Sequence, residues 1–179
     1  MLAVLSFPNP LHPALVHFPI VLLLLGAVVT VPAALITRWK LPLLAAILLS
    51  LGAIGTVVAV QTGESDGERI GETAATEQVL DQHEQWAERT QFVAIAAALL
   101  AVGALMTTRW AIVTAGLGAA TALAALVAAW CVAETGHYGG QLVYRHGAGV
   151  NLAPLGASGG PEGQSAPERR SHREHDDTQ

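Results

Sequence analysis

The sequence has little charge, few aromatic side chains and a single cysteine. Of its 179 residues, 13% are charged and 5% are aromatic, whereas 52% are hydrophobic. A lone cysteine, Cys131, excludes an intrachain disulfide, a cysteine-based zinc cluster and a covalently attached c-type haem, which needs two cysteines. A chain so rich in apolar residues, with its charges gathered in short segments, is typical of a membrane protein.

Motifs of the common enzyme classes are also missing. The chain has no phosphate-binding glycine loop and no serine nucleophile elbow, and HEQWA at His83 lacks the second histidine of an HExxH metalloprotease helix. No basic patch indicates nucleic acid, and no charge interrupts the middle of an apolar run as in an ion pump. We therefore expect an electron-transfer or structural protein in a lipid bilayer, rather than an enzyme.

Four apolar runs predict helices over residues 14–37, 41–61, 84–107 and 110–135. About 20 apolar residues are enough for a helix to cross the hydrocarbon of a bilayer. Apolar and polar residues do not alternate, so transmembrane strands are excluded. The predicted fold class is an all-α, four-helix transmembrane bundle. It occupies a membrane domain over residues 1–156, followed by a polar tail over 157–179 that we expect to be disordered.

The loop charges predict an orientation. Arg38 and Lys40 lie in the short first connection and Arg109 in the short third one, whereas the long second connection is mainly acidic. Positively charged loops usually stay in the cytoplasm. We therefore expect both termini and the long loop on the outer, periplasmic side of a bacterial inner membrane.

Histidines gather on this predicted outer side. The five outside the tail fall at helix ends or in outer loops, and they are His12, His17, His83, His137 and His146. Such a cluster is a candidate ligand set, although each histidine could instead be a hydrogen-bonding helix end. In HPALVHFP, His12 and His17 are five residues apart and would point about 140° apart on a regular helix. Pro13 and Pro19 allow a break between them.

The face of the predicted third helix below His83 carries small or hydrogen-bonding groups. They are Ala87, Thr90, Gln91, Ala94 and Ala98. Such a stripe could accommodate a flat macrocycle or the close approach of another helix. On the fourth helix, Gly116, Gly118 and Ala120 predict close helix packing.

The stretch GHYGGQLVYRHG over residues 136–147 holds two more histidines. His137 and His146 are nine residues apart, so regular helix or strand would point them apart. A turn at Gly139 and Gly140 would let both rings face the bundle, and the alternative is an interfacial terminus. Glu134 and Tyr144 are candidate partners that could orient a bound ring.

Four segments of the chain resemble one family. HPALVHFPI at 12–20, TGESDGE after the second helix, HEQWA at 83–87 and GGQLVYRHGAGV at 139–150 are similar to the bacterial membrane family named domain of unknown function 2231. The resemblance covers about residues 12–150. It implies a four-helix inner-membrane domain, whose relatives are sometimes joined to Rieske or cytochrome c domains. It also implies recurrent histidines at His12, His17, His83 and His146, with His137 present in a subset.

Three functional hypotheses follow. The leading one is a b-type haem near the outer face, with His17 and His83 as axial ligands, His137 and His146 as competing ligands, and electron transfer to a partner protein or a quinone. A second is a membrane scaffold that holds no cofactor. A third is copper or zinc bound by three or more of the five histidines.

Overall fold

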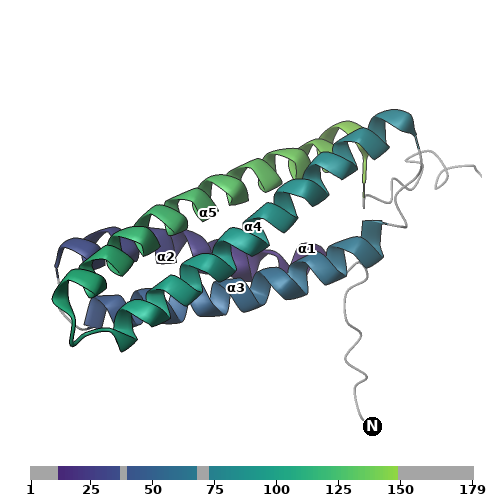
Figure 1. Cartoon of the computed structure of the whole chain (residues 1–179). Coiled ribbons are helices and arrows are strands. Elements are labelled where there is room, and N and C mark those ends of the chain that lie inside the picture. The colour runs from purple at the N-terminus through teal and green to yellow at the C-terminus, as the bar shows by residue number, and fades with distance from the viewer. Residues whose placement is uncertain (1–11, 37–39, 68–72, 149–179) are drawn as a thin grey trace, which may run out of the picture.

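The chain folds into a bundle of long helices (Figure 1). The computed structural model describes residues 12–36, 40–67 and 73–148. These residues form α1 (His12–Leu15), α2 (His17–Leu35), α3 (Lys40–Gly67), α4 (Ala74–Met106) and α5 (Ala111–His146). Four spans are long and apolar enough to cross a membrane: α1 with α2, α3, α4, and α5. The predicted fold class, an all-helical bundle with four transmembrane helices, is confirmed.

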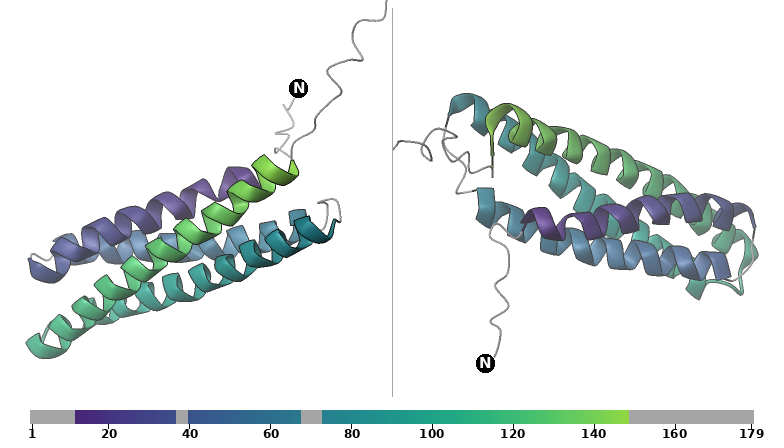
Figure 2. Two further views of the ribbon diagram at one scale, coloured as in Figure 1. Left: turned by 90° about the horizontal axis from the view of Figure 1, so that it is seen from above. Right: turned by 180° about the vertical axis from the view of Figure 1, so that it is seen from behind.

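The four spans form a closed ring. α2 packs on α3 and α5, and α4 packs on the same two helices. The chain thus forms two antiparallel hairpins, α1 to α3 and α4 to α5, laid against each other (Figure 2). α1 and the last turns of α5 lie at one end of the bundle, which we call the histidine end. The opposite end, with Ile36, Lys40 and residues 107–110, is called the loop end. Which end faces the cytoplasm stays a prediction.

The first hairpin is held by a reciprocal fit of leucines on glycines. Leu23 and Leu49 have no exposed surface. A Cβ added at Gly26 would lie 2.8 Å from Leu49 Cδ2, and one added at Gly52 would lie 2.7 Å from Leu23 Cδ2. Each leucine thus fills the space that the missing side chain leaves on the neighbouring helix, and α2 and α3 pack closely as membrane helices with small residues do.

The close packing predicted at Gly116 and Gly118 is not found. Among the described residues, no atom of another helix lies within 4 Å of a Cβ built at either glycine. Their place is on α5 near the loop end, where little of the helix surface is buried. Small residues therefore mark close helix contact in the first hairpin, and spacing alone did not identify which glycines make it.

A break at Val16 separates α1 from α2. Pro19 has no N–H, so the carbonyl of Leu15 loses its helical partner one turn later. The chain continues in helical geometry on both sides, with Val16 N–H donating to His12 O over 3.0 Å and Ile20 N–H donating to Val16 O over 3.3 Å. The prolines do permit the break that the sequence allowed, and His12 lies on a separate single turn.

The third and fourth spans are longer than the sequence predicts. α4 begins at Ala74, where Thr73 caps it by accepting a hydrogen bond from the N–H of Thr76, and α5 continues to His146. α4 has 33 residues and α5 has 36, so at 1.5 Å per residue they measure about 50 Å, well beyond a hydrocarbon core of about 30 Å. The histidine end of this hairpin therefore extends past the apolar layer. The predicted tail over 157–179 lies outside the described residues.

The turn at Gly139 and Gly140, one of the two alternatives for this segment, does not form, because both residues lie inside α5. α5 ends instead at Gly147, which has φ of 66°. The N–H of Gly147 donates to Val143 O and that of Ala148 donates to Leu142 O. The bond from Gly147 to Val143 is that of the αL capping motif, in which a left-handed glycine terminates a helix. Leu142 is buried against the rest of the bundle, and this packing outweighs the low helix propensity of the glycine pair.

Candidate functional site

His12 is fastened to the last turns of α3. Its Nδ1 donates a hydrogen bond to the carbonyl oxygen of Ala59 over 2.9 Å. The ring lies against Gly63, one turn further along α3, where an added Cβ would come within 3.0 Å of the ring carbon Cε1. The first hairpin thus holds the His12 imidazole at its own helix surface.

His83 is fastened to α5 in the same way. Its Nδ1 donates to the carbonyl oxygen of Thr135 over 2.9 Å. The ring lies against Gly139, again one turn beyond the carbonyl, where an added Cβ would come within 3.1 Å of Cε1. The small-residue face predicted below His83 is buried, with Thr90, Ala94 and Ala98 all covered. It serves the close approach of α5.

The two imidazoles lie side by side. Their ring centroids are 6.2 Å apart and their planes are nearly perpendicular, at 89°. A carbonyl oxygen only accepts hydrogen bonds, so Nδ1 carries the proton in each ring. In the neutral form of each ring, Nε2 is then the nitrogen with a lone pair, which is the atom a metal would bind. We call His12 and His83 the histidine pair.

His17 and His137 are both exposed. The Nδ1 of His17 donates to Pro13 O, one turn earlier, over 2.8 Å. The Nε2 of His137 accepts from the side-chain amide of Gln141 over 2.9 Å. His137 lies two residues before Gly139, which faces His83, so it is about 200° around α5 from that contact. The ring beside His83 is therefore that of His12 and not that of His17, which the sequence favoured.

The other candidate residues are His146, Tyr144 and Glu134. His146 is half-buried, and its Nδ1 is 3.3 Å from the hydroxyl of Thr76 on α4. Tyr144 is 91% exposed, and Glu134 is half-buried on α5. The groups that orient the histidine pair are the backbone carbonyls of Ala59 and Thr135. Side-chain patterns do not predict such acceptors.

Larger ligand sets do not form among the described residues. No group of three or more His, Cys, Asp or Glu side chains there could hold a metal ion. Zinc sites in proteins use three or four protein ligands, so a pair of imidazoles does not complete one.

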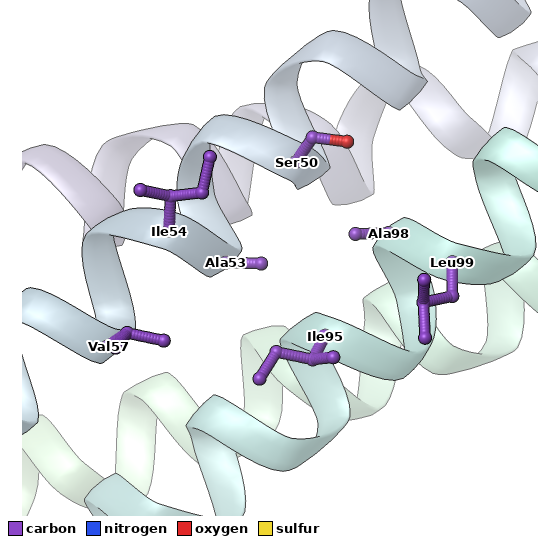
Figure 3. Close-up of a pocket in the computed structure, with 7 residues that line it drawn as sticks. All are labelled: Ser50, Ala53, Ile54, Val57, Ile95, Ala98 and Leu99. Atoms are coloured by element: carbon purple, nitrogen blue, oxygen red, sulfur yellow. The ribbon is translucent and has the colours of Figure 1, made fainter.

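A groove between α3 and α4 lies along the membrane-spanning part of the bundle (Figure 3). Its volume is about 250 Å³. Its lining consists of Ser50, Ala53, Ile54, Val57, Ile95, Ala98 and Leu99. Ser50 is the one polar residue in this lining, so the groove offers no ligand to a metal. It suits hydrocarbon and stays separate from the histidine pair.

Comparison with known families agrees with the fold. A family model described as a predicted membrane protein, domain of unknown function 2231 (DUF2231), matches residues 8–152. The chain belongs to this family. No curated protein and no solved structure matches it. The DUF2231 match spans all five described helices and both members of the histidine pair, so the resemblance drawn from the four sequence segments is confirmed.

Two features of this DUF2231 chain escaped sequence reasoning. One is the pairing of His12 with His83, which are 71 residues apart. The other is the role of Gly63 and Gly139, each of which leaves room for a ring. A signal for both exists in the sequence, since TGESDGE and GHYGG place a glycine near the end of the second helix in each hairpin.

Proposed function

We propose that this protein is a membrane electron-transfer protein that binds one b-type haem between His12 and His83 at the histidine end. The carrying observation is the distance of 6.2 Å between the ring centroids. Two metal–nitrogen bonds of about 2.0 Å each, with an imidazole radius added on either side, put two ring centroids about 6 Å apart. The pair thus has the spacing of two axial ligands on opposite sides of one metal.

Haem iron suits a two-histidine site better than a bare ion does. Its macrocycle supplies four nitrogens, so the protein needs to supply only two axial imidazoles. Copper or zinc bound by protein side chains alone would need at least a third ligand. The described residues contain no group of three or more His, Cys, Asp or Glu that could hold a metal ion. Bound here, the iron would supply one-electron redox chemistry.

The surroundings of the pair also suit this cofactor. Each Nδ1 proton is held by a backbone carbonyl, and a histidine that binds a metal commonly donates its second N–H to such an acceptor. Gly63 and Gly139 put no side chain of their own against the two rings. A planar group between the rings would lie at the interface of the two hairpins, near the bilayer surface, where a partner protein or a quinone could exchange electrons with it.

Optical spectra of the purified protein test this proposal. We expect the detergent-solubilised protein, expressed with added haem precursor, to show a Soret band and a sharp α band after dithionite. His12→Ala and His83→Ala should each lose the α band. His17→Ala and His137→Ala are matched controls, because both rings are exposed, and they should keep it. A wild-type protein without a Soret band, or loss of the band in His17→Ala but not in His12→Ala, would contradict the proposal.

The scaffold hypothesis has one specific observation in its favour. His12 ties α1 to α3 and His83 ties α4 to α5 through hydrogen bonds that need no cofactor. If this were their whole role, His12→Ala and His83→Ala would lower the thermal stability of a protein that carries no haem. The same purified variants, measured by thermal unfolding beside the optical spectra, distinguish the two functions.

A further inference from the structure

The two hairpins hold the His12 and His83 rings through equivalent contacts. In each hairpin, a histidine on the first helix donates to a carbonyl on the second and rests on a glycine four residues later. Residues four apart lie on the same face of a helix, so carbonyl and glycine form one surface beneath the ring. The two glycines, 51 and 56 residues beyond their histidines, thus hold the rings 6.2 Å apart with nearly perpendicular planes at the histidine end.

A side chain at either glycine would crowd the histidine ring. At Gly63 an added Cβ would lie 3.0 Å from Cε1 and 3.2 Å from Nδ1 of His12. At Gly139 the corresponding distances to His83 are 3.1 and 3.3 Å. Non-bonded carbon atoms prefer about 3.5 to 4.0 Å. An alanine at either position would therefore push its ring by a few tenths of an ångström or more.

A ring displaced by an added Cβ still has its Nδ1 hydrogen bond to the carbonyl one turn earlier. We therefore expect the ring to rotate about this hydrogen bond rather than to move away from the helix. The plane of the ring changes, while the histidine and its metal-binding nitrogen remain. An alanine would thus alter the angle between the rings, now 89°, without deleting a ligand.

We infer that Gly63 and Gly139 are positioning residues that set the planes of the His12 and His83 imidazoles, and so hold the two axial ligands of the site perpendicular. This inference rests on the proposed haem site for its consequence, but its geometry concerns the chain alone. The glycines act through the histidines, because the contacts at each are with the ring.

Gly63→Ala and Gly139→Ala test this inference in the haem-loaded protein. Electron paramagnetic resonance of oxidised low-spin haem reports the angle between axial imidazole planes through its g values. We expect both variants to bind haem as the wild type does but to shift the largest g value. Gly140→Ala is the control, because it lies next to Gly139 on α5 with no described atom within 4 Å of an added Cβ, and its g values should not change. Unchanged g values in both test variants would overturn the inference.

A second measurement does not depend on haem. In protein free of cofactor, nuclear Overhauser effects between ring protons of labelled histidines and their neighbours report the orientation of each ring. We expect changed ring-proton signals from His12 in Gly63→Ala and from His83 in Gly139→Ala, whereas Gly140→Ala should match the wild type. If both signals stay unchanged, the inference fails even where haem binds. If they change but no haem binds, the inference holds and the proposed function fails. Alanine favours a helix over glycine by about 1 kcal/mol, so these variants should fold.

Discussion

Backbone carbonyls orient the candidate ligands in this protein. The acceptors are Ala59 and Thr135, and either position could carry another side chain and still offer its oxygen. Sequence reasoning placed His12 and His83 among five candidate histidines at one end of a bundle with no mid-membrane charge, but it chose His17 rather than His12 as the partner of His83. It could not pair them, because the pairing depends on backbone acceptors and on space left at Gly63 and Gly139. Neither property shows in the spacing of the histidines.

The reciprocal leucine and glycine contacts of the first hairpin predict a large effect from a small substitution. Gly52→Ala would add a Cβ 2.7 Å from Leu23 Cδ2, and Leu23 has no exposed surface into which it could move. Overpacking of this kind costs about 1 to 3 kcal/mol. We expect a lower midpoint of thermal unfolding in detergent. Gly118→Ala, on the open face of α5, is the control and should leave the midpoint unchanged or raise it, so equal losses in both variants would contradict this prediction.

Among the elements, the membrane-spanning helices are predictable and their ends are not. Apolar runs identify the four spans because a bilayer requires about 20 apolar residues in each. The extra turns of α4 and α5 lie beyond that layer, where the chain is polar and apolar length carries no signal. Thr73 as a cap and Glu77 in the first turn of α4 are the local signals that mark the true start. In α5, Gly139 and Gly140 favour a turn in isolation. They are helical here because Leu142 is buried and Gly139 contacts His83.

The end of α5 predicts different outcomes for two glycines. Gly147 has φ of 66°, a left-handed conformation that costs residues with a side chain about 1 to 2 kcal/mol, whereas Gly140 is helical. We expect Gly147→Ala to speed amide hydrogen exchange at the last turn of α5 by several-fold, because the capping bonds to Leu142 and Val143 weaken. Gly140→Ala should slow exchange in the same turn. Slower exchange in Gly147→Ala would show that the capping geometry does not hold this terminus.

For the molecule as a whole, the distribution of charge predicts which end lies outside. Lys40 and Arg109 lie at the loop end, whereas Glu77, Asp81 and Glu88 lie on the part of α4 nearest the histidine end. Basic loops are retained in the cytoplasm, so the histidine pair should face the periplasm of a bacterial inner membrane.

Cysteine labelling checks this orientation. The native Cys131 is buried and can be replaced by alanine to give a cysteine-free background. A membrane-impermeant maleimide applied to intact cells should then label Tyr144→Cys, at a side chain that is 91% exposed. Thr108→Cys at the loop end should react only after the membrane is permeabilised. The reverse pattern would place the histidine pair in the cytoplasm.

The break at Val16 makes the two members of the histidine pair mechanically unequal. His83 lies ten residues into a helix of 33 residues, so its backbone cannot shift without disturbing that helix. His12 lies on the single turn of α1, joined to α2 where Pro19 has removed a helical hydrogen bond. A flat molecule that enters between the rings would therefore displace His12 and leave His83 in place. His83 is thus the fixed ligand of the pair and His12 the movable one.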